Sequence, residues 1–266
     1  MADLVLSERD GAILTLTLNE PERRNPISDT ATVDALCAAL EAADRDLSVR
    51  CVVLTGAGSA FSSGGDLKKM VPGGGLKDAL PGHTRRNYKA GIQRIPTLMQ
   101  ALEVPVVAAV NGPAIGAGLD LATMCDVRVA SDTAKFAESF VKLGIIPGDG
   151  GAWFLPRVVG FPKACELALT GETIDAAEAL RIGLVNHVVP AAELLAKARE
   201  IAGKIAANPP HATRMAKRLL REAQVATLPN ILDMSAAMQA IAHATRDNDE
   251  AIAAFNERRT PNFTGE

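Results

Sequence analysis

Aromatic side chains are scarce in this sequence, at 3% of its 266 residues, and Trp153 and Tyr88 are its only tryptophan and tyrosine. Proteins that hold carbohydrate or single-stranded nucleic acid by stacking need aromatic faces, so both classes are disfavoured. An excess of basic charge is also missing, because the formal net charge is −3. Without a basic field to attract phosphates, we expect no nucleic-acid partner.

Patterns typical of disulfide frameworks and metal sites are missing as well. The four cysteines lie far apart in apolar segments, and the four histidines are equally dispersed. This spacing fits neither a disulfide scaffold nor a zinc site, so we predict buried free thiols and no metal. The cysteines are Cys37, Cys51, Cys125 and Cys165.

Long apolar runs are absent too. No segment approaches the length needed to cross a bilayer. Residues 1–10 carry three acidic side chains and lack the apolar core of a signal peptide. From these absences we expect a cytoplasmic protein that makes no membrane contact. The hydrophobic content of 48% is enough for a substantial aliphatic core.

Strand and helix patterns alternate over the first two thirds of the chain, after which only helical patterns follow. This indicates an α/β core over residues 1–190 and a helical region over 191–266. The apolar residues of that helical region predict packing against another subunit. The expected strands are 12–18, 51–55, 105–110 and 126–130, and the expected helices are 30–43, 86–102, 116–124, 150–159, 191–207, 210–224, 229–243 and 247–258.

Two glycine-rich segments, 55–67 and 111–121, each follow an apolar strand. Neither is a dinucleotide fingerprint, since Phe61 stands where a third glycine is needed, and no P-loop lysine motif is present. Each segment leads onto a helix start, where unpaired backbone N–H groups favour negative charge. Side by side, the two loops would form an oxyanion hole. The alternative is that the glycines only permit tight turns and close packing.

Five motifs together resemble the enoyl-CoA hydratase/isomerase (crotonase) family, in that family's order and over nearly the whole chain. They are Leu-Asn-Glu-Pro-Glu-Arg-Arg-Asn-Pro at 18–26, Gly-Gly-Asp-Leu at 64–67, the Val-Asn-Gly-Pro-Ala and Gly-Ala-Gly pair within 110–118, Ile-Ile-Pro-Gly-Asp-Gly-Gly at 145–151, and 254–263. The resemblance implies an α/β fold with a crotonase-like ββα spiral core and a helical C-terminal oligomerisation region. Trimers or dimers of trimers are usual in the family.

The resemblance also implies site residues. The backbone N–H groups of Gly65 and Ala117 match the family's oxyanion hole, which grips a thioester oxygen as it gains charge. Other positions match the coenzyme A site, and the last two of them help close it, in some members from a neighbouring subunit. For the two arginines among them, a solvated surface role remains the alternative. Coenzyme A would arrive as part of the substrate, with no further cofactor. The matching positions are Arg24, Pro26, Ser63, Gly65, Leu67, Phe255 and Arg258.

The acid/base positions depart from the family's hydratases, which use two glutamates around one water. Asp120 matches the first, and its alternative role is a first-turn aspartate stabilised by the helix dipole. Phe140 matches the second and cannot transfer a proton. Asp149 lies one position after Gly148, where some isomerases carry an aspartate. It is either an acid/base or an N-cap for the helix 150–159. Glu138 would point to the same side as Phe140 if that segment were extended.

These departures favour a proton shuttle over addition of water. Asp120, alone or with Asp149, would move a proton along the acyl chain and shift a double bond, while the oxyanion hole holds the dienolate. Two alternatives stay open. One is a hydratase that uses Asp120 with Asp149 or Glu138, and the other is a non-catalytic acyl-CoA-binding relic.

Overall fold

The computed structural model describes residues 3–266 and contains two β-sheets. The larger has the strand order β1-β2-β3-β4-β6-β9, in which only the β1–β2 pair is antiparallel. The smaller has the order β5-β7-β8. The strands are β1 (Val5–Asp10), β2 (Ile13–Leu18), β3 (Cys51–Gly56), β4 (Val106–Val110), β5 (Ala114–Ile115), β6 (Val127–Ser131), β7 (Lys135–Ala137), β8 (Thr173–Asp175) and β9 (His187–Val189).

The chain moves repeatedly from the larger sheet to the smaller one and then into a helix, as in β4–β5–α4. This is the mixed α/β spiral that the resemblance implies. The helices are α1 (Thr30–Arg45), α2 (Pro81–Ala90), α3 (Arg94–Ala101), α4 (Ala117–Met124), α5 (Gly151–Val159), α6 (Phe161–Thr170), α7 (Ala176–Arg181), α8 (Leu194–Ala206), α9 (Pro210–Glu222), α10 (Leu228–His243) and α11 (Arg246–Glu257). Short 3-10 turns are η1 (Pro21–Arg23), η2 (Leu67–Lys69), η3 (Ser139–Leu143) and η4 (Ala191–Glu193).

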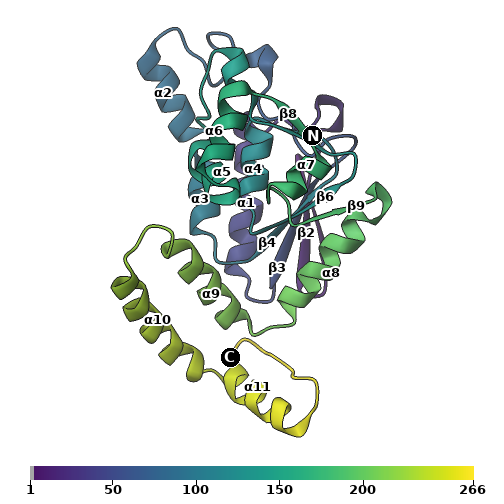
Figure 1. Ribbon diagram of the computed structural model, residues 1–266, viewed down its shortest axis with the longest axis vertical. Helices are drawn as coiled ribbons and strands as arrows, with labels where there is room; N and C mark the ends of the chain where they lie inside the picture. Colours follow the sequence, from purple (N-terminus) through teal and green to yellow (C-terminus); the bar gives the residue numbers. More distant parts are fainter. Residues whose placement is uncertain (1–2) are drawn as a thin grey trace.

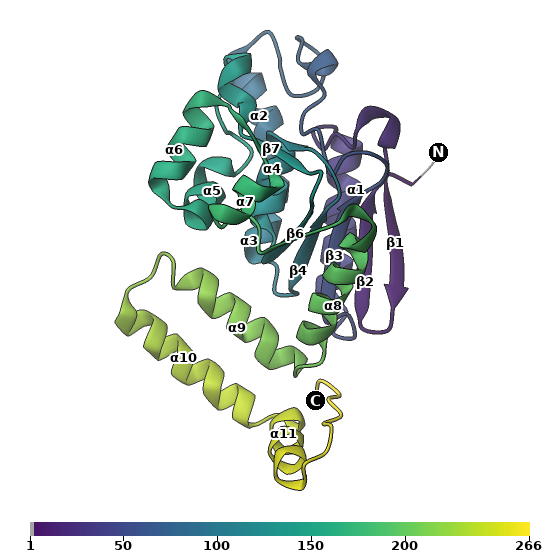
Figure 2. The same cartoon turned by 45° about the vertical axis from the view of Figure 1, so that its right-hand side comes forward.

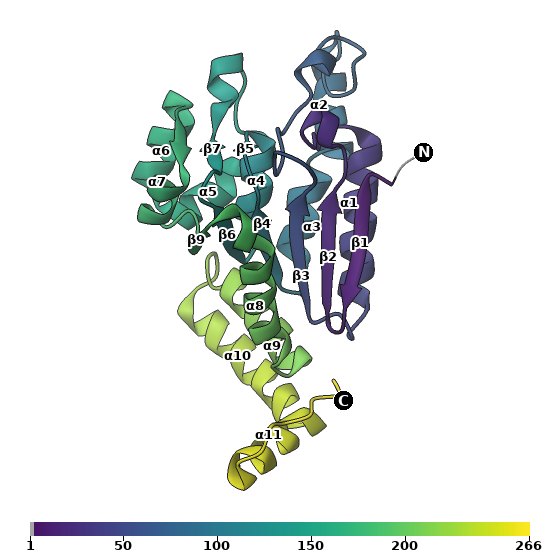
Figure 3. The same cartoon turned by 90° about the vertical axis from the view of Figure 1, so that its right-hand side faces the viewer.

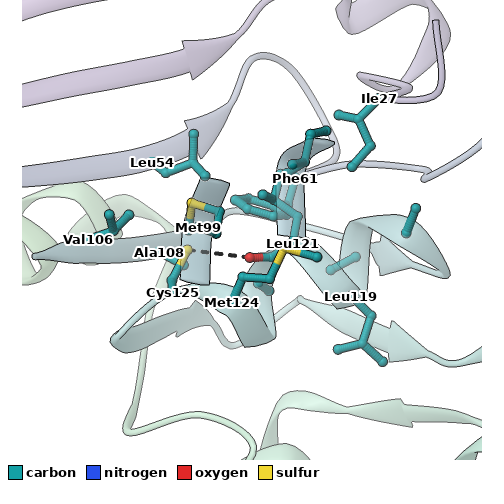
Figure 4. Packing of buried hydrophobic residues seen from close by; sticks show 14 of the residues in the cluster. Ile27, Leu54, Phe61, Met99, Val106, Ala108, Leu119, Leu121, Met124 and Cys125 are labelled. Carbon is teal, nitrogen blue, oxygen red and sulfur yellow. Dashed lines mark hydrogen bonds between the residues drawn. The ribbon is translucent and has the colours of Figure 1, made fainter. Parts of the chain in front are cut away.

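The larger sheet is apolar on both faces. Along β3, Val52 and Leu54 join the main core, whereas Cys51 and Val53 face the other way and pack with α8. Side chains from β4 and from the buried α4 meet Leu54 in the main core (Figure 4). Burial on both faces explains the unbroken apolar runs of the central strands, because a parallel sheet is covered by helices on each side.

The helices α9, α10 and α11 form an arm that projects beyond one end of the sheet (Figures 1 and 2). The last strand ends at Val189, close to the predicted boundary at residue 190. The next helix, α8, still packs on the sheet (Figure 3), so the outlying part begins after Ala206. Polar contacts anchor the arm: Lys217 on α9 donates to the Val104 carbonyl at 2.6 Å and pairs with Asp126.

One predicted helix is wrong in extent. The segment 86–102 forms two helices, α2 and α3, because the backbone at Gly91 takes φ −104° and ψ −116°, outside the helical region. The predicted free thiols are confirmed, with Cys165 only partly buried. Within residues 3–266 no helix has the length and hydropathy of a membrane span, and no cluster of His, Cys, Asp and Glu is suited to a metal ion.

Candidate active site

Asn25 holds the first glycine-rich loop in place. This buried side chain accepts a hydrogen bond from Glu20 N–H at 2.9 Å and donates to the carbonyls of Ala57 and Ala60 at 2.9 and 2.8 Å. Its backbone takes φ +54°, a left-handed conformation that asparagine tolerates better than most residues. Asn25 therefore fastens the loop that follows β2 onto the loop that follows β3.

The two glycine-rich loops meet at the start of α4. Gly64 has φ +78°, and a methyl group there would collide with the Ile115 carbonyl and lie 3.0 Å from Ala117 N. Within residues 3–266, neither Gly65 N–H nor Ala117 N–H donates a hydrogen bond. The structure thus brings together the two N–H groups singled out from the sequence and leaves both available.

Other glycines of these loops serve close packing, as the alternative interpretation expects. Methyl groups at Gly56, Gly112 and Gly118 would each collide with a backbone carbonyl of residues 59–62. Gly56 therefore lets the first loop close on itself, whereas Gly112 and Gly118 let the two loops touch, and this contact places the free N–H groups at the helix start.

Asp120 lies one turn into α4 and is fully buried. Neither carboxyl oxygen has a hydrogen-bond partner of good geometry within residues 3–266. Burial, and then the charges of Glu138 and Asp149, raise the pKa of Asp120 well above its usual range, while the nearby Gly151 N–H opposes the shift. Stabilisation by the helix dipole is therefore outweighed by burial among like charges.

Glu138 lies directly beside Asp120. A methyl group on Gly151, the first residue of α5, would collide with both Asp120 Oδ1 and Glu138 Oε1, so the two carboxyls border the same small space. Glu138 is 1% exposed, and both of its oxygens lack hydrogen-bond partners within residues 3–266. Burial, with a contribution from the Asp149 charge, raises its pKa to about 7.

Asp149 is the third buried carboxylate of this cluster. Burial raises its pKa to about 6, and its Oδ1 has no hydrogen-bond partner within residues 3–266. It does not act as an N-cap, because Gly150 occupies that position of α5 without a side-chain capping bond. The charge of Asp149 also contributes, after burial, to a raised pKa of Tyr88 on α2. No Lys, Arg or His pairs with Asp120, Glu138 or Asp149 in the described chain.

Phe140 fills the space beside the loop that carries Ala117 N–H. It is 6% exposed, and its ring Cζ lies 3.5 Å from the place that a Cβ on Gly116 would occupy. The expectation that Glu138 would point the same way as Phe140 required an extended segment. Glu138 instead takes φ −91° and ψ 67° at the start of η3, so the two side chains reach different neighbours.

A cavity of about 400 Å³ opens near the free N–H of Gly65. Met70 connects Gly65 to this cavity, because its Cε would touch a methyl group on Gly65 and its side chain also lines the cavity. Tyr88 lines the same cavity, and a Cβ on Gly148 would lie 3.8 Å from its ring. Lys77, Asp78 and Thr84 form the polar part of the wall, and the larger, apolar part is Met70, Leu76, Pro81, Tyr88, Leu143 and Ile145.

Four of the coenzyme A candidates cluster beside this loop pair. Arg24 is exposed with φ +59°, and its carbonyl accepts a hydrogen bond from Ser63 N–H at 2.8 Å. Pro26 forms an isolated parallel β-bridge with Gly64. The side chain of Leu67 is 56% exposed. These contacts place Arg24, Pro26 and Ser63 together beside Gly64.

Phe255 and Arg258 lie elsewhere. Both belong to the end of α11 on the arm, and Phe255 is 84% exposed. The arm and the α2 region lie at opposite ends of the molecule in all three views (Figures 1, 2 and 3). Within one chain, Phe255 and Arg258 therefore lie away from the coenzyme A candidates beside the two glycine-rich loops.

The comparisons with known proteins agree with this architecture. A family model described as "Enoyl-CoA hydratase/isomerase" matches residues 8–266. The chain is 39% identical over 262 residues to "Probable enoyl-CoA hydratase echA8" of Mycobacterium bovis, with 98% of each chain covered. It is 37% identical over 267 residues to the 1,2-epoxyphenylacetyl-CoA isomerase of Escherichia coli, with all of both chains covered. The crystal structure of an enoyl-CoA hydratase from Bacillus anthracis matches with a TM-score of 0.92 and 35% identity, covering 99% of this chain and 100% of that one.

The relatives include enzymes named as hydratases and as isomerases, on a fold that matches over the whole length. The chain is therefore an enzyme of the enoyl-CoA hydratase/isomerase family, and it acts on acyl-coenzyme A thioesters.

Proposed function

We propose that this enzyme shifts a double bond in an enoyl-CoA by moving protons between carboxyl groups. Gly65 N–H and Ala117 N–H would hold the thioester oxygen, and one such donor typically contributes about 3–4 kcal/mol of transition-state stabilisation. Both groups are free, and they lie on loops in direct contact, which supports this role.

The carboxyl groups divide into an acid and a base because their environments differ. Asp149, with a pKa of about 6, is mostly ionised near neutral pH and would accept a proton from the acyl chain. Asp120, with its pKa raised much further, would keep a proton and deliver it to another carbon. The C–H bond electrons become the new double bond, and those of the old double bond pass to the thioester as a dienolate, which then forms the new C–H bond with the Asp120 proton. A proton finally returns from Asp149 to Asp120. No atoms are gained or lost.

The observation that carries this proposal over hydration is the position of Phe140. Addition of water requires an acid and a base around a held water molecule. The Phe140 ring packs beside Gly116, at the loop that carries the Ala117 N–H, and provides no polar group there. The apolar cavity lined by Tyr88 and Ile145 would take the acyl chain.

Hydration remains the second candidate because of one contact. Asp120 and Glu138 meet over Gly151, so an adjacent carboxyl pair does exist. Both reactions are distinguished by incubating a trans-2-enoyl-CoA and its 3-enoyl isomer with enzyme in deuterated water, followed by mass spectrometry. Isomerisation gives deuterium uptake and double-bond migration, whereas hydration adds the mass of deuterated water.

Variants at the two aspartates test the roles. We expect Asp120→Asn and Asp149→Asn each to reduce isomerisation by at least about 100-fold, the usual contribution of one acid or base. Rapid addition of water by the wild type would refute the isomerase assignment. Turnover by Asp120→Asn at the wild-type rate would refute the proton shuttle. Tight acyl-CoA binding without exchange in any enzyme form would identify a binding relic.

We further propose that the chain forms a trimer or a dimer of trimers. No residue of α10 is buried in the single chain, and large apolar side chains are exposed on the arm. Burying such side chains against another subunit removes apolar surface from water. In that assembly, Phe255 and Arg258 would close a neighbour's coenzyme A site. Light scattering of the purified chain would test this, and a monomer would refute it. The exposed apolar residues are Leu228, Leu232, Ile241, Ile252 and Phe255.

A further inference from the structure

We infer that Glu138 is a positioning residue that shares one proton with Asp120 and, by its negative charge, keeps that proton on Asp120 in the resting enzyme. This inference rests on the proposed proton shuttle and adds a residue to it. Glu138 would not touch the substrate. It would set the protonation state of the group that does.

The first observation is the contact between the two carboxyls. Among the glycines of residues 3–266, Gly151 is the one whose missing side chain makes room for both, since a methyl group there would collide with Asp120 Oδ1 and Glu138 Oε1. Two carboxyls this close cannot both be ionised without strong repulsion, and one of them therefore retains a proton.

The second observation is that nothing else neutralises the pair. Asp120 and Glu138 are 0% and 1% exposed, and none of their four oxygens bonds to a side chain of residues 3–266 outside the pair. The titratable groups that affect the cluster are Asp149, which raises the pKa of both carboxyls, and Tyr88, which is affected by Asp149 in turn. No ion pair with a basic side chain reaches Asp120, Glu138 or Asp149 in that part of the chain. A shared proton is therefore the available means of limiting the buried charge.

The third observation assigns the proton within the pair. Burial and the charge of Asp149 raise the pKa of both groups, but the charge of Glu138 raises the pKa of Asp120 further, to well above its usual range, whereas the pKa of Glu138 rises only to about 7. Asp120 therefore holds the proton and Glu138 carries the charge. When Asp120 gives its proton to the acyl chain, two anions face each other, and this repulsion favours rapid return of the proton from Asp149 to Asp120.

The test compares Glu138→Gln with the wild type in two measurements. Glutamine keeps the size of the side chain but removes its charge. The first measurement is the pH profile of isomerisation, whose alkaline limit reports loss of the proton from the acid. The second is infrared difference spectroscopy of the free enzyme, in which a protonated buried carboxyl has its own carbonyl band. That band can be titrated without turnover, and Asp120→Asn identifies which part belongs to Asp120.

We expect Glu138→Gln to move both the alkaline limit and the titration of the Asp120 band to lower pH by at least about one unit, because a like charge is removed. Glu138→Asp keeps the charge and should return both towards the wild-type values. Glu172→Gln, an exposed position in the described chain, serves as the matched control and should change neither.

The outcomes separate this inference from the proposed function. If Glu138→Gln folds and leaves both measurements unchanged while Asp120→Asn abolishes turnover and removes the band, Glu138 has no role in proton placement and the shuttle stands. If Asp120→Asn turns over normally, the shuttle fails, and the inference about its proton donor fails with it. If Glu138→Asp behaves like Glu138→Gln, the charge of Glu138 is not the cause, which also overturns the inference.

Discussion

Replacing Asp149 by asparagine should stabilise the folded protein at alkaline pH and leave its stability unchanged at acidic pH. The carboxyl is 6% exposed, and one oxygen has no hydrogen-bond partner within residues 3–266. Burial raises its pKa from 3.8 to about 6. An asparagine of the same shape has no charge to bury, so the variant removes this penalty at the cost of the proposed base.

The direction in which the free energy of unfolding changes with pH follows from proton binding. The folded pKa is above the unfolded value, so between about pH 4 and 6 the folded state binds more protons than the unfolded one, and stability falls as pH rises. The contribution of Asp149 is fully favourable below about pH 4 and is lost once the pH has passed through about 6. A shift of roughly two pH units corresponds to about 3 kcal/mol, which is an upper bound because asparagine also needs hydrogen-bond partners.

The assay is thermal or urea unfolding of wild type and Asp149→Asn at about pH 4 and pH 8. For a chain of this size, about 3 kcal/mol corresponds to an increase in Tm of roughly 6–12 °C at pH 8. At pH 4 we expect no difference. Asp10→Asn, at an exposed strand end, is the control and should change Tm at neither pH. An equal change in Tm at both pH values, or destabilisation at pH 8, would refute the argument that Asp149 is a buried charge.

Two further substitutions test how the site is built. Gly151→Ala should destabilise the fold by about 1–3 kcal/mol, because the added methyl group would collide with Asp120 and Glu138, and it should abolish isomerisation. The control is Gly203→Ala in α8, where a methyl group meets open space, and it should stabilise the fold by up to about 1 kcal/mol. Urea unfolding of both checks the contrast, and stabilisation by both would contradict the contact. Asn25→Ala should lower the free energy of unfolding by about 1–3 kcal/mol, because it leaves buried carbonyls unpaired, and it should raise the KM for acyl-CoA. A normal KM would show that Asn25 does not position the loop.

The parts of the fold that could be predicted from the sequence are those in which apolar residues recur with a clear helical or strand period. The helices of the arm begin and end within about two residues of the predicted limits, because their apolar spacing and flanking prolines are local signals. The strands β5 and β7 have only two and three residues, too few to show any period. They pair with distant segments, and such pairing is not encoded locally.

In the candidate site, too, contacts between distant segments could not be predicted from the sequence. Asp120 and the glycines next to Ala117 could be singled out because a helix start after a strand is visible in the sequence. The proximity of Glu138 to Asp120 could not, because it depends on a backbone at φ −91° and ψ 67° and on Gly151 arriving from another segment. An absent side chain at Gly151 creates the contact, and the sequence shows that glycine only as one of several.

The positions of Phe140 and Glu138 explain each other. A phenyl ring beside Gly116 leaves no polar group there, and the carboxyl of Glu138, two residues earlier, borders the same space as that of Asp120. Beside Asp120, Glu138 can hold or repel a proton on that carboxyl, whereas Phe140 is the side chain that packs against Gly116. This arrangement suits the proposed isomerisation, which needs control of a proton already bound rather than activation of a water molecule.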